Sequence, residues 1–147
     1  MKTVTLILAV IISATASAQR VTKTISDKMI SGVYAENIRI TDERFDSTFV
    51  VLSFPDLEVK RRTEMVEIVF RTRAQVDTFA VKLHRAITLT DSSRMGIAYS
   101  FRQALYRIEL DEYSKDIYVT TPNGVKYTIL TRKEAERLIA YLRTVKF

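Results

Sequence analysis

Apolar and polar residues alternate with a period of two over several short segments of the chain, and this alternation predicts β-strands. The segments are 33–41, 48–54, 65–71, 94–101, 104–110, 116–121 and 125–130. Both alternating sets are largely apolar in 48–54, which predicts a central strand covered on both faces. In 94–101 large residues alternate with Gly96, Ala98 and Ser100, which indicates close packing against the small-residue face.

The turns between these segments are marked by polar residues, proline and glycine. Residues 42–47 are polar and predict a turn. Pro122-Asn123-Gly124 predicts a type I turn with proline at its second position and glycine in the left-handed region. The strands that flank this turn are predicted to share one apolar face, whose residues are Ile117, Val119, Val125, Tyr127 and Ile129.

Two segments have the period of an amphipathic helix, one over 72–88 and one that begins at Thr131 and has an apolar stripe that reaches Val145, close to the C-terminus. Each begins with a threonine that is followed three residues later by glutamine or glutamate, the pattern of a capping box. These pairs are Thr72 with Gln75 and Thr131 with Glu134. The apolar stripes are Val76, Phe79, Ala80, Leu83 and Ile87 in the first segment, and Ala135, Leu138, Ile139, Leu142 and Val145 in the second.

The two helical segments align with each other at one offset of 59 residues, at which Thr72 falls on Thr131. The preceding strands align at the same offset, with Val66 over Val125. This pattern predicts duplicated strand–strand–helix units with a further hairpin between them. The predicted fold class is α+β, a mostly antiparallel sheet of about six to seven strands with two helices packed on one face.

The first 18 residues have the pattern of a cleaved export signal. Lys2 is followed by the apolar run 4–12, and Ala16-Ser17-Ala18 fits the site that signal peptidase cleaves, before Gln19. An apolar run of this length falls short of the roughly 20 residues that span a bilayer. The expected organisation is therefore a leader over 1–18, a polar N-terminal arm or edge element over 19–32, and one domain over 33–147.

Composition adds to this picture of an exported protein. A chain of 129 residues after cleavage suits a single domain with a core of its own. The chain has no cysteine, which is ordinary for a bacterial envelope protein and excludes both disulfides and a lipidated cysteine. We expect the mature chain to be periplasmic or secreted and to lack a transmembrane span.

The charge of the chain is basic. Of its 23 Lys and Arg, only Lys2 lies in the leader, so 22 remain against 17 Asp and Glu, a net charge of +5. A basic protein outside the cytosol is expected to associate with anionic envelope polymer rather than with nucleic acid. Lys60, Arg61 and Arg62 are the candidate contacts to such a partner.

The chain offers little catalytic chemistry. His84 is its only histidine and is predicted to lie at the surface of a helix, and three glycines provide no phosphate-binding loop. The carboxylates fall in predicted turns, without the spacing of a calcium loop. They are Asp42, Glu43 and Asp46 in one group and Asp111, Glu112 and Asp116 in the other. We expect no enzyme activity, no cofactor and no metal.

Three hypotheses of function follow. The leading one is a non-catalytic binding or scaffold domain, with Tyr113, Tyr118 and Tyr141 as candidate interface residues, because tyrosine suits protein interfaces. The second is a basic module that docks on anionic envelope polymer. The third is a self-associating structural protein, which pairs through an edge strand or through the small-residue face of 94–101. The ligand and the oligomeric state are left open.

Overall fold

The protein consists of two antiparallel four-stranded sheets, and each sheet is followed by a helix. The computed structural model describes residues 20–30, 32–57, 65–90 and 99–147. The first sheet contains β1 (Val21–Ile30), β2 (Val33–Asp42), β3 (Phe45–Pro55) and β4 (Met65–Phe70), and α2 (Arg73–Thr90) follows it. The second contains β5 (Tyr99–Arg102), β6 (Arg107–Leu110), β7 (Ile117–Thr120) and β8 (Tyr127–Leu130), and α3 (Arg132–Leu142) follows it.

The α+β class is confirmed, but the prediction of one sheet with six to seven strands is wrong. The described residues form eight strands in two sheets. Of the two alternatives for 19–32, an arm or an edge element, the structure has the second, because β1 is an edge strand. Its side chains are mostly exposed, so alternation did not identify it as a strand. It is held by backbone pairing to β2. The predicted turn over 42–47 is also too long, because the turn is Glu43-Arg44 and β3 already begins at Phe45.

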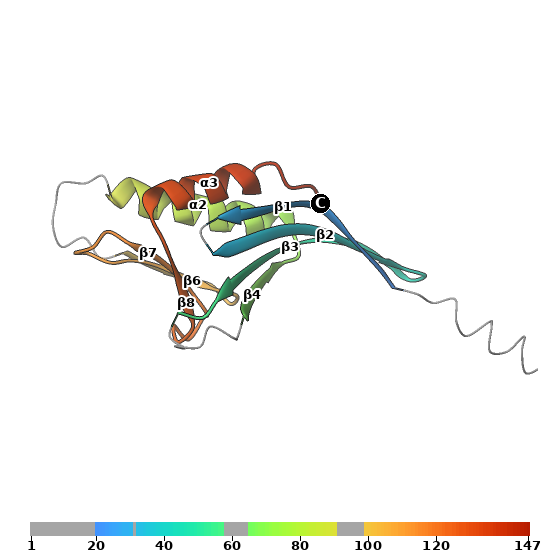
Figure 1. The fold of residues 1–147 in the computed structure, drawn as a ribbon, viewed down its shortest axis with the longest axis horizontal. Helices are drawn as coiled ribbons and strands as arrows, with labels where there is room; N and C mark the ends of the chain where they lie inside the picture. Colours follow the sequence, from blue (N-terminus) through green and yellow to red (C-terminus); the bar gives the residue numbers. More distant parts are fainter. Residues whose placement is uncertain (1–19, 31, 58–64, 91–98) are drawn as a thin grey trace, which may run out of the picture.

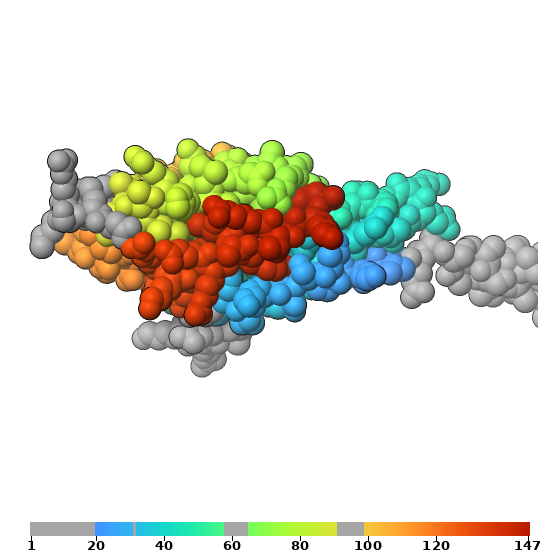
Figure 2. Space-filling view, turned by 90° about the horizontal axis from the view of Figure 1, so that it is seen from above, coloured from blue at the N-terminus to red at the C-terminus, as the bar shows by residue number. Residues whose placement is uncertain are grey.

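Both helices lie side by side on the same side of the two sheets (Figures 1 and 2). The helix α2 contacts β6 and β4, and α3 contacts β1 and β8, so each helix touches both sheets. The sheets also meet directly where β3 contacts β8, and just beyond β3 the N–H of Leu57 donates to the carbonyl of Tyr127 at 3.2 Å. The predicted helical stripes therefore converge on one core, in which each fully buried large side chain contributes about 1.5–3 kcal/mol.

An aromatic cluster occupies the centre of this core. The Tyr106 ring packs against Phe79 at 4.9 Å and against Phe70 at 5.9 Å between ring centroids. Burial raises the pKa of Tyr106 to about 12. This phenol is therefore neutral and protonated at ordinary pH, and it serves packing rather than acid–base chemistry.

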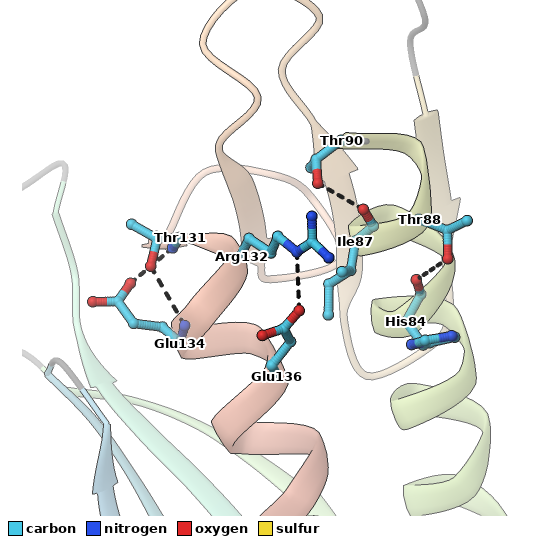
Figure 3. Close-up of polar contacts among 8 residues, drawn as sticks. All are labelled: His84, Ile87, Thr88, Thr90, Thr131, Arg132, Glu134 and Glu136. Carbon is cyan, nitrogen blue, oxygen red and sulfur yellow. Dashed lines mark hydrogen bonds and ion pairs between the residues drawn. The ribbon is translucent and has the colours of Figure 1, made fainter. Parts of the chain in front are cut away.

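The two helix starts resemble each other but differ in one hydrogen bond. Thr131 and Glu134 form the complete predicted capping box, with the backbone N–H of Thr131 donating to Glu134 Oε2 at 2.7 Å (Figure 3). At the start of α2, the backbone N–H of Gln75 donates to Thr72 Oγ1 at 3.3 Å. The amide oxygen of Gln75 accepts from the N–H of Arg71 instead of from that of Thr72.

The turn at Pro122-Asn123-Gly124 is confirmed. The N–H of Gly124 donates to the carbonyl of Thr121 at 2.8 Å, and Gly124 has a φ of +76°. The predicted face of the following strand is wrong by one residue. Residues Thr128 and Leu130 are buried, while Tyr127 and Ile129 face the other way.

The predicted repeat therefore holds for the helices and shifts in the strands. The buried positions of α2 and α3 keep the offset of 59 residues, as in Phe79 and Leu138. The inward positions of β4 and β8 are 60 residues apart, as in Phe70 and Leu130. The reason is that one residue fewer separates β8 from its helix cap.

Candidate functional site

The first sheet extends beyond the helices as an arm, which consists of residues 21–25 of β1 and 38–49 of β2 and β3 (Figures 1 and 2). Its length follows from strand geometry. The 11 residues of β3 extend over about 36 Å at 3.3 Å per residue, whereas the 18 residues of α2 rise about 27 Å and the 11 residues of α3 about 16 Å. The strands β1 to β3 therefore continue where the helix layer has ended.

The face of the first sheet that points away from the helices carries a cluster of apolar side chains. We name it the outer apolar cluster, and its members are Ile38, Ile40, Phe45, Phe49, Val51 and Val69. The strand register places Ile38 beside Phe49 and Val51 beside Val69. The rings of Phe45 and Phe49 stack with their centroids 6.0 Å apart. The cluster therefore forms one contiguous surface over three strands.

The outer apolar cluster is separate from the core. Val51 is only 9% exposed, yet it does not belong to the core cluster, because its cover comes from neighbours on the same face. Phe45 is 42% exposed, and the other members except Val51 are half-buried. A hollow of about 350 Å³ lies on this face, with Arg20, Glu67 and Arg71 at its rim. A contiguous exposed apolar surface with a polar rim is typical of an interaction site.

The corresponding face of the second sheet is more polar, although Tyr118, Tyr127 and Ile129 also lie on it. Arg107 forms an ion pair with Glu109 at 2.5 Å, and Ser100 and Arg102 are exposed on the same face. The rings of Tyr118 and Tyr127 lie 5.6 Å apart. The outer faces of the two sheets are equivalent in topology but differ in chemistry. The more apolar face belongs to the first sheet, which extends as the arm.

The helix side of the arm is charged. Arg39 of β2 holds Asp46 of β3 through two hydrogen bonds, one of them from Nε to Oδ1 at 2.7 Å. The hydrogen bonds from Arg39 lower the pKa of the Asp46 carboxyl, which stays ionised at neutral pH. Lys23 and Lys146 border a hollow of about 390 Å³ on this side. The arm thus has one apolar and one charged face.

Between these two faces lies an open strand edge. Pairing of β3 with β4 begins at Val50, opposite Phe70, so 45–49 pair only with β2 in the part of the chain that the structure describes. A hollow of about 640 Å³ runs beside these residues, with Arg39, Arg71 and Phe147 as its other walls. Unpaired strand edges are templates for the addition of a further strand.

The predicted interface tyrosines do not come together. Tyr113 is 82% exposed in the turn before β7, and Tyr118 lies on the outer face of the second sheet. Tyr141 does not lie on an exposed side of its helix, so it is unavailable to a partner. It is 9% exposed, and its hydroxyl donates to the carbonyl of Ser26 at 2.9 Å, so this residue fixes β1 to α3. The predicted basic contacts, Lys60, Arg61 and Arg62, lie outside the described residues.

The predicted acidic groups mostly stabilise turns. Asp111 Oδ1 accepts hydrogen bonds from the backbone N–H groups of Tyr113 and Ser114, which lower its pKa. Asp42 accepts from the N–H of Arg44 at 2.8 Å. His84 is exposed on α2, and its backbone carbonyl accepts from Thr88 (Figure 3). Among the residues described, no three His, Asp or Glu side chains gather as a metal site would require.

The sequence contains a signal for the outer apolar cluster. Both faces of 48–54 are apolar, which predicts a central strand. The strand β3 is central within its sheet, but only its even-numbered side chains meet the helices. Phe49 and Val51 face outward and pack against Ile38 and Val69. When helices cover one face of a sheet, a strand with apolar side chains on both faces thus indicates that the uncovered face is apolar too.

Comparisons of the chain with protein-family models, with curated proteins and with solved structures found no match. Neither described helix has the length and apolar character needed to cross a membrane.

Proposed function

We propose that this protein is an exported, non-catalytic binding domain that buries its outer apolar cluster against another polypeptide. The observation that carries the proposal is the contiguous apolar surface on the outward face of the first sheet, which contains a phenylalanine that is 42% exposed. An exposed surface of this kind lowers solubility unless something covers it. The outer face of the second sheet, which carries the Arg107–Glu109 ion pair, supports the proposal, because the shared topology tolerates charged side chains at that place.

The catalytic alternative has less support. The carboxylates of Asp46 and Asp111 have lowered pKa values and are held by hydrogen bonds, so they are poor general acids near neutral pH. The most buried phenol with a pKa shift, that of Tyr106, lies inside the aromatic cluster. These environments suit structural roles.

The proposal is tested by photocrosslinking in the exporting bacterium. The photoreactive residue p-benzoylphenylalanine replaces Phe49 in one variant and Tyr118, on the outer face of the second sheet, in the matched control. We expect a discrete crosslinked product at position 49 and none at position 118. The product should disappear when Ile40→Asp, which places a charge in the outer apolar cluster, is added to the first variant. Equal crosslinking at both positions, or a product that Ile40→Asp leaves unchanged, would contradict the proposal.

A second candidate is docking on an anionic envelope polymer, and the basic side of the arm favours it. The same hollow is lined by Lys23, Arg39 and Lys146. Of these three, Arg39 forms an ion pair with Asp46. Binding of the purified protein to a polyanion such as polyphosphate should then weaken steeply as salt rises. The double variant Lys23→Ala/Lys146→Ala should reduce it further. Binding that is insensitive to both changes would exclude this candidate.

A further inference from the structure

We propose that the polypeptide that covers the arm is a second copy of this chain, and that the two copies pair antiparallel through the open edge 45–49 of β3. This inference rests on the proposed function, because it names the partner of the same surface. It joins the two first sheets edge to edge, so that β1, β2 and β3 of both copies form six neighbouring strands across the two arms. The oligomer would have two-fold symmetry, in which the same surface patch serves both copies.

The backbone of the edge is available for this pairing. Asp42 and Phe45 close a two-residue turn, and such a closing pair is hydrogen-bonded within its hairpin. Alternation along β3 then directs the N–H and C=O groups of Asp46 and Thr48 away from β2, toward the open edge. The hollow of about 640 Å³ lies on that side, where β4 has not yet begun to pair.

The side chains of the edge are complementary to a second copy of themselves. The segment Phe45-Asp46-Ser47-Thr48-Phe49 has the same classes of side chain in both directions. Antiparallel pairing about Ser47 sets Phe45 opposite Phe49 of the second copy on the outer face. It sets Asp46 opposite Thr48 on the helix side. The two outer apolar clusters then become neighbours, and aromatic cross-strand pairs of this kind stabilise sheets.

Charge does not oppose the pairing. Asp46 is the one charged residue of the segment, and the ion pair with Arg39 of its own chain already neutralises it. The two Asp46 residues also lie diagonally in the proposed register, each opposite a threonine. Like charges directly opposite one another, which destabilise a strand pair, are thereby avoided.

The other edge of the first sheet is β1, and it has features that hinder pairing with a further strand. In β1 the register shifts between Thr24 and Ser26, which is a bulge. The charged side chains Lys23, Asp27 and Lys28 lie along the same strand. Bulges and edge charges are the means by which proteins block strand addition. The segment 45–49 lacks a bulge, a proline and a lysine.

The first test is sedimentation velocity of the purified exported protein from roughly 1 to 100 µM, a range that resolves micromolar dissociation constants. We expect a dimer, and Phe45→Lys should raise its dissociation constant at least about tenfold, by removing an aromatic contact and adding a charge. The matched control is Met65→Lys, which changes an apolar residue on β4 that is 53% exposed, against 42% for Phe45, and should leave the dimer unchanged. Circular dichroism checks that both variants stay folded.

The second test uses the absence of cysteine from the chain. Ser47→Cys should form an intermolecular disulfide rapidly under mild oxidation, because the two Ser47 residues face each other across the proposed axis. Tyr113→Cys, which is more exposed but remote from the arm, should stay largely monomeric.

Three results would overturn the inference: a strict monomer at 100 µM, a dimer weakened only by Met65→Lys, or equal crosslinking of both cysteine variants. A strict monomer that keeps the photocrosslink at position 49 would refute the second copy as partner and leave the proposed function standing.

Discussion

The two halves of the chain share one order of elements and use it differently. Each half has four antiparallel strands in sequence order and then a helix. In the second half every strand has 4 residues, whereas β1, β2 and β3 in the first half have 10, 10 and 11. Four-residue strands suffice to pair and to meet the helices, so the additional length of the first half is not needed for the core.

The additional length instead forms the arm. The core-facing residues of both halves are similar, with buried apolar side chains under both helices. The outer faces differ, because the first is apolar over Ile38, Phe49 and Val69 and the second contains the Arg107–Glu109 ion pair. The elements that both halves share form the core and stabilise the fold. The arm belongs to the first half alone, and we infer that it carries the function.

The largest expected effect separates the core from the arm. Phe70→Ala removes a fully buried ring from the aromatic cluster and should lower the free energy of unfolding by about 3–5 kcal/mol. Phe45→Ala removes a ring that is 42% exposed and should lower it by only about 0.5 kcal/mol. Urea titrations of both variants measure the difference. A loss from Phe45→Ala as large as that from Phe70→Ala would show that the arm belongs to the core and would break the comparison.

A smaller effect sharpens the comparison of the two helix starts. Glu134→Ala removes a charged acceptor from the N–H of Thr131, and should lower the free energy of unfolding by about 1 kcal/mol. Gln75→Ala removes a neutral acceptor from the N–H of Arg71, and should lower it by roughly half as much. Thermal and urea unfolding measure both values, and Glu134→Gln should recover part of the loss. A larger loss of unfolding free energy from Gln75→Ala than from Glu134→Ala would contradict this ranking of the two helix starts.

The helices and the turns could be predicted because their signals are local. The capping box of Thr131 and Glu134 and the turn at Gly124 each depend on residues within a few positions of one another. The apolar stripes are predictable for the same reason. Every predicted member from Ala135 to Val145 is buried, although α3 ends at Leu142 and Val145 lies beyond it.

The sheets and the site could not be predicted in the same way because they depend on distant pairing. The strand β1 has mostly exposed side chains, so only its pairing with β2 defines it. The face of β8 depends on a single residue in the spacing before Thr131, and a shift by one residue reverses every side chain of a strand. The outer position of Phe49 and Val51 is decided by the helices, which cover only one face of the sheet.

The measurement that most directly tests the central claim is the labelling rate of single cysteines in the intact bacterial envelope. Phe45→Cys reports on the outer apolar cluster, and Ser100→Cys on the outer face of the second sheet. N-ethylmaleimide labelling is compared with that of the same variants purified and diluted. The account predicts that Phe45→Cys is labelled at least about tenfold more slowly in the envelope, whereas Ser100→Cys reacts equally in both settings. Equal rates for Phe45→Cys in the two settings would contradict the claim that another polypeptide covers the arm.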